Sequence, residues 1–264
     1  MKKLITAFLA AIFLAAGSAY AAGTLEDIAQ ADKELYVIVK PLALKGYANA
    51  QVTFGLMYYS GRGVAQNDVE AVKWFELAAA QGNASAQTNL GVMYGNGRGV
   101  VQDYTEAIKW FKLAAAQGDV LAQAKLGLMY DKGWGVTQDY VEAIKWFKLA
   151  AAQGDATAQS ILGNIYNEGK GVTQDYVEAV KWYKLAAAQG DAVAQTSLGA
   201  MFLEGKGVTK DYVATHMWLN LAGTKGDEGG RKARDLIEKE MTPQQIAEAQ
   251  KLARECLARN YKGC

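Results

Sequence analysis

The sequence predicts an all-α fold, a right-handed α-solenoid of stacked helix-turn-helix hairpins. Two residue types recur at a constant interval of 36 residues along most of the chain. The tryptophans of this series are Trp74, Trp110, Trp146, Trp182 and Trp218, and the glutamines are Gln51, Gln87, Gln123, Gln159 and Gln195. A constant period of this length is typical of solenoids, in which each unit is one supersecondary motif stacked on the next. In each unit, two stretches with helical spacing of apolar residues flank a glycine-rich turn, which predicts a helical hairpin.

One copy, residues 84–119, shows how the unit is built. Its first helix, helix A, stops in the run 95–99, because clustered glycine and asparagine break helices and permit positive φ. Its second helix, helix B, begins at Asp103, and Glu106 three residues later completes a predicted capping box. Gly118 then ends helix B, where a left-handed backbone favours glycine. The five copies occupy residues 48–83, 84–119, 120–155, 156–191 and 192–227.

The periodic tryptophans are interpreted as packing residues. A row of aromatic ligand contacts is the alternative, but identical spacing in every copy favours a wedge between one hairpin and the next. On this interpretation Trp146→Ala costs about 3–5 kcal/mol through lost burial and the cavity left behind.

Residues 1–21 have the features of a cleavable signal peptide. Two lysines precede an apolar run over 4–16, and an A-x-A site at 19–21 predicts cleavage after Ala21. The apolar run is too short for a membrane-spanning helix, which needs about 20 residues. We therefore expect a periplasmic or secreted protein with no membrane insertion after cleavage.

The nearly equal numbers of basic and acidic side chains exclude partners that bind through a large net charge. The chain has 28 basic and 27 acidic side chains, and removal of the two leader lysines leaves 28 − 2 = 26 basic against 27 acidic. No basic surplus attracts nucleic acid or an anionic membrane, so neither partner is expected. A repeat array has no single core to complete, and we expect a monomer.

The two ends depart from the repeat and are predicted to be caps. Residues 22–47 form an N-terminal capping helix, and residues 228–264 form C-terminal capping helices. The run 242–245 combines a capping box with proline at the first helical position. Cys256 and Cys264 also lie in this segment. Export implies an oxidising compartment, where the two could be bonded; two free thiols are the alternative.

No constellation of catalytic residues is visible in the sequence. His216 is the only histidine, which excludes a Cys/His zinc set and the two-histidine metalloprotease motif. We interpret it as a structural histidine. The repeated G-x-G loops follow helices and lack G-K-[ST], so they are interpreted as hairpin turns rather than phosphate sites. We expect no enzyme activity, no cofactor and no bound metal.

Two stretches of each copy carry a resemblance to a known family. They read A-x-A-Q-x-x-L-G-x-M-Y-x-x-G-x-G-V and D-Y-x-E-A-x-K-W-F-x-L-A-A-A-Q-G-D, and they span residues 48–227. The chain therefore resembles the Sel-one-like repeat family, a branch of the tetratricopeptide-like helical solenoids. The resemblance implies an adaptor or scaffold. Exported bacterial members are similar to proteins of envelope signalling, cell-wall or exopolysaccharide control, or host contact.

In tetratricopeptide-like arrays, helix A lines the concave face that usually binds an extended peptide. The corresponding positions vary between copies of this chain, so the fold leaves them free to serve a partner. The candidate partner-binding residues are Val52, Leu56, Tyr59, Thr88, Asn89, Val92, Ala124, Lys125, Leu128, Asp131, Ser160, Asn164, Asn167 and Thr196. Such a groove is small, mixed and lightly charged, which suits backbone hydrogen bonding to a peptide. The alternative is that these positions are simply solvated.

Trp134 is the one tryptophan outside the period. It stands between two loop glycines, where other copies carry arginine or lysine. Tryptophan is enriched at binding hot spots, so Trp134 is a candidate contact anchor. The alternative is that its ring folds back over Met129.

Two functions from different classes remain. The first is an exported, non-catalytic scaffold that binds a protein segment of unknown identity on helix A. The second is a cell-wall-active enzyme, or an envelope protein that binds peptidoglycan or sugar. Related proteins discussed in that light carry paired cysteines in each repeat, which this chain lacks, and fold analogy alone assigns no chemistry. The sequence favours the scaffold.

Overall fold

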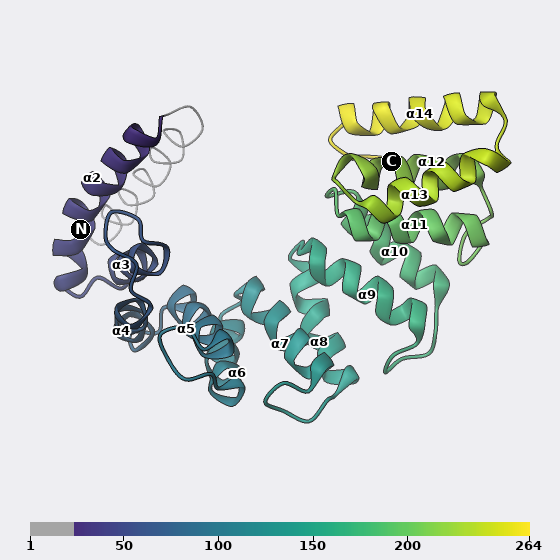
Figure 1. Cartoon of the computed structure of the whole chain (residues 1–264). Helices are drawn as coiled ribbons and strands as arrows, with labels where there is room; N and C mark the ends of the chain where they lie inside the picture. The colour runs from purple at the N-terminus through teal and green to yellow at the C-terminus, as the bar shows by residue number, and fades with distance from the viewer. Residues whose placement is uncertain (1–23) are drawn as a thin grey trace. The chain divides into compact units, whose positions relative to one another are not determined.

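The computed structural model describes residues 24–264, and within this range it is built entirely of helices (Figure 1). It contains thirteen α-helices and one 3-10 helix, and no strand occurs in the described range. The all-α fold of stacked hairpins predicted from the period is confirmed. The predicted signal peptide, residues 1–21, lies outside the described residues. No helix between residues 24 and 264 has the length and apolar character to cross a membrane.

Each copy of the repeat folds into one helix A and one helix B. The A helices are α3 (Ala48–Ser60), α5 (Ala84–Asn96), α7 (Val120–Lys132), α9 (Ala156–Glu168) and α11 (Ala192–Glu204). The B helices are α4 (Asp68–Ala79), α6 (Tyr104–Ala116), α8 (Tyr140–Ala152), α10 (Tyr176–Ala187) and α12 (Tyr212–Thr224). The flanking helices are α2 (Leu25–Leu44) before the first copy, and α13 (Glu228–Ile237), η1 (Glu238–Glu240) and α14 (Pro243–Ala258) after the last.

By its internal contacts the chain divides into two compact units. The first unit contains the described residues up to Leu126 together with Trp134–Val136, and the second contains Gly127–Gly133 and Thr137–Cys264. The division falls within α7, the helix A of the third copy. Each unit is described by itself below.

In the first unit, α2 packs on α3 through an apolar core. Leu35 and Val39 of α2 are buried together with Phe54 and Met57 of α3. Trp74 of α4 packs against the same cluster, with its ring 4.9 Å from that of Phe54. Burial of each large apolar side chain stabilises the fold by about 1.5–3 kcal/mol. The first hairpin and α2 therefore form one packed body.

The two helices of a hairpin approach closely at a glycine. A Cβ atom on Gly91 of α5 would lie 2.6 Å from the ring of Phe111 in α6. Gly127 has the same relation to Phe147 in the second unit, at 2.7 Å. Side-chain carbons do not approach so closely in packed interiors. The recurring Leu-Gly dipeptide of helix A therefore reflects the space that the aromatic ring of helix B needs.

Helix B begins at the predicted cap, but the predicted capping box is only half formed. The Asp103 carboxylate accepts a hydrogen bond from the Glu106 N–H at 2.9 Å. The Glu106 side chain accepts from the Lys109 ammonium at 2.7 Å instead of reaching back to Asp103. The Asp103 N–H donates to the Tyr94 carbonyl at 3.0 Å. The reciprocal bond was wrongly predicted because a carbonyl of helix A already serves that N–H group.

The predicted packing role is confirmed for Trp74, Trp110 and Trp218 by the buried clusters they join. Trp110 of α6 packs against a cluster that contains Phe75 of α4 and Leu90 of α5. Trp218 of α12 is 3% exposed within the core of the second unit. Three indole N–H groups are buried without an acceptor among the described residues, those of Trp110, Trp146 and Trp182. These three indole groups therefore make no hydrogen bond to the described residues, and Trp110 is held by apolar packing.

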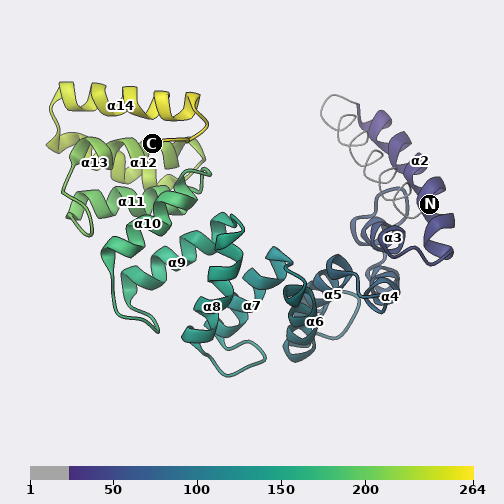
Figure 2. The same cartoon turned by 180° about the vertical axis from the view of Figure 1, so that it is seen from behind.

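In the second unit, α14 runs alongside α12 in both views (Figure 1, Figure 2). An earlier helix B, α10, carries an ion pair between Glu178 and Lys181 at 2.9 Å. The corresponding residues of α12 are Ala214 and Met217, which pack in the same cluster as Leu252 of α14. Uncharged side chains at these two positions let another helix dock without burying charge.

His216 ties the segment after α13 back to α12. The side chain is completely buried, and its Nε2 lies 2.7 Å from Oε1 of Glu238 in η1. Its Nδ1 is buried without a partner among residues 24–264. This arrangement is structural, as the sequence indicated. The predicted box at the start of α14 also forms, with reciprocal hydrogen bonds between Thr242 and Gln245.

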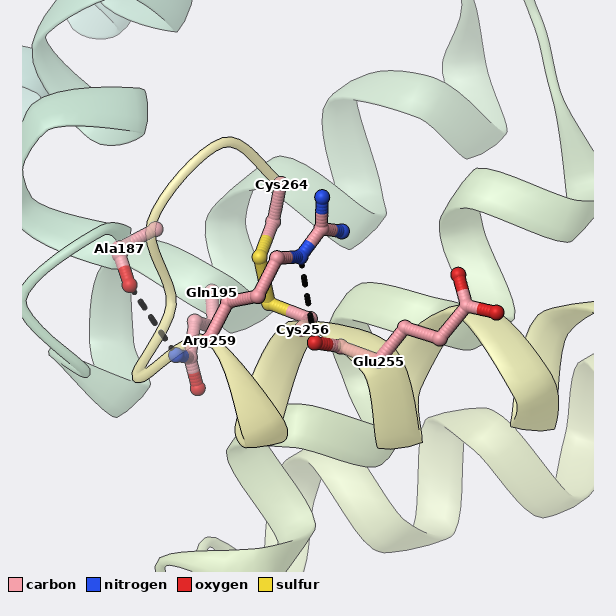
Figure 3. Close-up of a disulfide and its surroundings, with 6 residues drawn as sticks. All are labelled: Ala187, Gln195, Glu255, Cys256, Arg259 and Cys264. Carbon is pink, nitrogen blue, oxygen red and sulfur yellow. Dashed lines mark hydrogen bonds between the residues drawn. A yellow bond between two sulfur atoms is a disulfide. The ribbon is translucent and has the colours of Figure 1, made fainter.

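The two cysteines lie together at the end of α14. Cys256 of α14 and Cys264 are joined by a disulfide with their Cα atoms 5.6 Å apart (Figure 3). Cys256 is completely buried, whereas Cys264 is exposed. The structure therefore has the bonded pair rather than two free thiols.

Candidate functional site

Three of the candidate groove positions are not available to a partner. Val52, Thr88 and Ser160 are 8%, 5% and 5% exposed. Val52 lies in the buried cluster that also contains Phe75 and Leu90. The residue after the repeated glutamine thus faces neighbouring helices rather than solvent in these copies. The prediction that these three side chains contact a partner was wrong for that reason.

The remaining candidate positions of helix A keep part of their surface exposed. In the first unit they are Leu56, Tyr59, Asn89, Val92, Ala124 and Lys125. In the second unit they are Leu128, Asp131, Asn164, Asn167 and Thr196. Rigid-body docking uses surface that is already exposed, so these residues stay candidates for partner contact.

In the second unit, two of these side chains already have strong hydrogen-bond partners. Asn164 Oδ1 accepts from the Tyr183 hydroxyl at 2.7 Å, and Thr196 Oγ1 donates to Asp227 at 2.6 Å. Burial raises the pKa of Tyr183 to about 12, so the phenol stays protonated and remains a donor at neutral pH. The hydrogen bond from Thr196 is the main cause that lowers the pKa of Asp227. Both pairs favour a structural role for these positions.

The first unit has a cavity on its helix A surface. It has a volume of about 210 Å³. Its walls are Leu35, Thr53, Leu56, Met57, Tyr59, Ser60 and Arg62. The cavity therefore brings together two candidate residues, Leu56 and Tyr59, and adds Leu35 from α2. Apolar walls with a few polar groups are typical of pockets that receive one apolar side chain of a ligand.

Arg62 in this wall is held by a carboxylate of α2. Its Nε and Nη2 donate to Asp32 Oδ1 at 3.1 and 2.9 Å. Asp32 is 7% exposed, so water screens this ion pair less than it screens an exposed one. The pair fixes the loop after α3 against α2 and neutralises the guanidinium charge. The cavity is thus better suited to an uncharged side chain than to an anion.

Tyr59, in the same wall, is held by Arg98 of the next copy. The guanidinium of Arg98 lies 4.0 Å from the centroid of the Tyr59 ring, a cation–π contact. Arg98 is itself oriented by Asp68, to which it donates two hydrogen bonds at 2.9 and 2.8 Å. These bonds are the main cause that raises the pKa of Arg98. The ring of Tyr59 is thereby held in place before any ligand arrives.

The Trp134 ring has an aromatic partner within the first unit. Its ring stacks on that of Tyr104 in α6, with centroids 5.6 Å apart and an interplanar angle of 14°. The side chain remains 41% exposed. Trp134 and Tyr104 occupy the places that Arg98 and Asp68 hold one copy earlier. The ring therefore replaces an ion pair between copies and keeps an exposed aromatic surface.

The sequence interpretation missed Leu35, Arg62 and Arg98. The roles of Arg62 and Arg98 depend on contacts between residues 30 positions apart, such as Asp32 with Arg62. The same spacing separates Asp68 and Arg98, so a pattern was present. It becomes meaningful only when the hairpin geometry brings such positions together. Leu35 reaches the cavity because α2 packs on α3.

The described residues do not converge on a metal site. Among residues 24–264, no three His, Cys, Asp or Glu side chains lie where they could hold a metal ion. His216 is completely buried and bonded to Glu238, so no substrate reaches its ring.

Comparison with known proteins identifies the repeat. The Sel1 repeat model matches residues 48–83, 84–119, 120–155, 156–191 and 192–227. No curated protein matches the chain. Its structure resembles that of a Sel1 repeat protein from Oxalobacter formigenes, with a TM-score of 0.71 and 33% identity over 86% of this chain and 99% of that one. It also resembles immunity protein Pa5087 from Pseudomonas aeruginosa, with a TM-score of 0.54 and 21% identity over 81% and 80% of the two chains. The chain belongs to the Sel1 repeat family.

Proposed function

We propose that the protein is a non-catalytic scaffold that binds a segment of another protein on the helix A surface of its first unit. The observation that carries the proposal is the cavity in which Leu56 and Tyr59 meet Leu35 of α2. Sel1 repeat proteins are generally protein–protein interaction scaffolds, and the family is typically non-catalytic. Solenoids present extended surfaces to their partners, which agrees with this role.

The cavity would act as the anchor point of the interface. A single apolar side chain of the partner would fill it, and its burial would supply most of the binding free energy, as hot-spot residues do. Asn89 and Val92, one copy further along, are partly exposed and would contact the flanking residues of the segment. The fixed positions of Tyr59 and Arg62 reduce the ordering entropy that binding costs.

We place this interaction outside the cytoplasm, in the periplasm or among secreted proteins. The support is the signal-peptide pattern of residues 1–21, and bacterial Sel1 proteins are often exported. Envelope signalling, cell-wall processes and host contact are the settings that the family resemblance suggests. The mass of the mature protein tests the export step, since cleavage after Ala21 predicts a chain that begins at Ala22.

The binding surface is tested by two matched leucine substitutions in the first unit. Leu56→Arg places a charge in the cavity wall, whereas Leu77→Arg places the same charge on α4, where Leu77 is 50% exposed. Both variants and the wild type would be immobilised and used to capture proteins from the native envelope. Thermal unfolding followed by circular dichroism would establish that both variants remain folded.

The proposal expects one protein that binds the wild type and Leu77→Arg but not Leu56→Arg. Burial of a guanidinium in an apolar wall removes the anchor and leaves the rest of the unit unchanged. Equal capture by Leu56→Arg and the wild type would show that the cavity does not bind the partner.

A further inference from the structure

The residues after α14 form a hook, defined here as residues 259–264, that places one aromatic ring against an earlier turn. Tyr261 in the hook is 6% exposed. Its ring lies 3.0–3.4 Å from the position that a Cβ atom on Gly190 would take. The Tyr261 N–H donates to the Cys256 carbonyl at 2.9 Å. The ring also joins a buried cluster with Ala187 of α10.

The backbone of the hook is strained. Asn260 (φ 51°) and Tyr261 (φ 65°) are the only non-glycine residues with positive φ among residues 24–264. Left-handed backbone is unfavourable for a bulky residue such as tyrosine and persists only where the surroundings impose it. Both residues lie inside the loop that the Cys256–Cys264 disulfide closes. The crosslink and the contacts of Tyr261 together hold the strained conformation.

The turn beneath Tyr261 recurs in earlier copies, where it is uncovered. Gly82, Gly154 and Gly190 each end a helix B with a positive φ of 80–94°. A Cβ atom at Gly82 or at Gly154 would meet nothing within 4 Å. A glycine turn of this kind presents a flat stretch of backbone on which an aromatic ring can lie. In the last case the chain itself supplies that ring.

The same place contains a buried acceptor that lacks a donor. In two earlier copies a glutamine at the end of helix B donates to a glutamine of helix A: Gln117 to Gln87 and Gln189 to Gln159, both at 2.8 Å. The corresponding acceptor here is Gln195, which is completely buried and donates to the Ala187 carbonyl at 3.3 Å (Figure 3).

Lys225 explains why this acceptor is unsatisfied. It stands where the earlier copies have the donating glutamine, and its ammonium lies 5.3 Å from the centroid of the Tyr261 ring. Oε1 of Gln195 therefore has no partner among the described residues. An unmade hydrogen bond of a buried carbonyl is unfavourable. The hook therefore lies against Gly190 and Lys225 with a strained backbone, while Oε1 of Gln195 keeps no donor among the described residues.

We propose that the niche formed by Gly190, Lys225 and Oε1 of Gln195 is a binding site for a tyrosine-bearing segment of a partner protein. Tyr261 occupies the niche in cis while the disulfide is closed. An unstrained segment places its ring against Gly190 and within reach of the Lys225 ammonium, as Tyr261 does. A backbone N–H of that segment satisfies Gln195. Because the external segment has an unstrained backbone and satisfies Gln195, it displaces the hook once the disulfide is reduced.

Opening the site requires a dithiol reductant. Its thiolate attacks the sulfur of Cys264, because Cys264 is exposed and Cys256 is buried. The S–S bond breaks, and Cys256 leaves as a thiolate that takes up a proton. The second thiol of the reductant then resolves the mixed disulfide and releases Cys264 as a thiol. Two electrons and two protons pass to the protein, and the dithiol becomes a disulfide.

The chain's own hook provides the probe for a binding experiment. The probe is a fluorescent, acetylated and amidated peptide with the sequence of residues 257–262, Leu-Ala-Arg-Asn-Tyr-Lys. The matched control peptide carries alanine in place of tyrosine. Fluorescence anisotropy would be measured with the full chain in three forms: oxidised wild type, wild type reduced by dithiothreitol, and oxidised Tyr261→Ala. Circular dichroism would establish that all three are equally helical.

The proposal expects the tyrosine peptide to bind reduced wild type and Tyr261→Ala at least about tenfold more tightly than it binds oxidised wild type. The alanine peptide should bind Tyr261→Ala about tenfold more weakly than the tyrosine peptide does. Lys225→Ala in the Tyr261→Ala background should weaken binding about two- to fivefold, whereas Lys206→Ala in the same background should not.

Two results would overturn the proposal. One is equal affinity of the tyrosine and alanine peptides for folded Tyr261→Ala. The other is equal affinity of the tyrosine peptide for oxidised wild type and Tyr261→Ala. The site belongs to the second unit and Leu56 to the first, so failure of this proposal leaves the proposed scaffold function untouched.

Discussion

Arg98 donates two hydrogen bonds to Asp68, a residue 30 positions earlier in the chain, at 2.9 and 2.8 Å. Arg62 and Asp32 repeat the relationship one copy before. In the third copy the aromatic pair of Trp134 and Tyr104 takes the same two places. These three pairs therefore meet at a spacing of 30 residues rather than at the period of 36.

The ion pair between Arg98 and Asp68 should couple neighbouring copies measurably. The two side chains are 32% and 26% exposed, so screening by water limits the pair to about 1 kcal/mol. A double-mutant cycle with Asp68→Ala and Arg98→Ala, measured by urea unfolding, should return a coupling energy of that size. Arg98→Lys should not restore it, since an ammonium lacks the bidentate geometry. If the effects of the two single substitutions on the free energy of unfolding were additive, Arg98 and Asp68 would not be coupled.

Two glycines of α5 should respond to alanine with opposite sign. Gly91→Ala forces a methyl group against the Phe111 ring at 2.6 Å, and such overpacking costs about 1–3 kcal/mol. Gly95 has only the Ala107 Cβ nearby, at 3.9 Å. Gly95→Ala should therefore stabilise the unit by up to about 1 kcal/mol through helix propensity. Chemical denaturation of both variants provides the comparison. A stabilising Gly91→Ala would contradict the close packing of the hairpin.

The hydrogen bond between the two glutamines should stabilise each copy to a similar extent. Gln189→Lys recreates at Gln159 the unsatisfied carbonyl that Gln195 has, and should destabilise the second unit by about 1–3 kcal/mol. Lys225→Gln should supply a donor to Gln195 and change stability in the opposite direction. Its gain is smaller because the contact of Lys225 with the Tyr261 ring is lost. Equilibrium unfolding of both variants provides the measurement. If both substitutions changed the free energy of unfolding in the same direction, this explanation would be wrong.

Acid should weaken the start of α13. The Asp227 carboxylate caps this helix, and its pKa is lowered chiefly by the hydrogen bond from Thr196. A depressed pKa contributes stability that is complete above the ordinary value near 3.8 and is lost as the pH falls through the lower folded value. Thr196→Val should move the pKa of Asp227 upward, so protection of α13 against hydrogen exchange is lost at a higher pH. An unchanged carboxylate titration by NMR would rule this out.

The fold could be predicted from the sequence because its determinants repeat. The Trp series, the Gln series and the side-chain cap at the start of helix B each occur five times. The Leu-Gly dipeptide occurs four times, because the first copy has Phe54-Gly55 in its place. The reciprocal bond from Glu106 was mispredicted because the carbonyl of Tyr94 competes for the same N–H group. Such competition depends on where two helices meet, which local sequence does not encode.

The candidate surface was predictable only in part. Leu56 and Tyr59 were identified from their variability between copies, and the structure places them in one cavity. The same criterion selected Val52 and Thr88, which are buried. Variation between copies shows that the repeat tolerates different side chains at a position. It does not show whether solvent or a neighbouring helix surrounds that position, because both environments accept small residues.

The proposed function depends on partner binding at the helix A surface of the first unit. The most direct test replaces Leu56 with a photo-crosslinking phenylalanine analogue and makes the same replacement at Leu77 on α4. Irradiation in the native envelope should attach a single protein through position 56, and a Leu35→Arg change in the cavity wall should abolish the product. No product at position 56, or the same product from both positions, would contradict the claim.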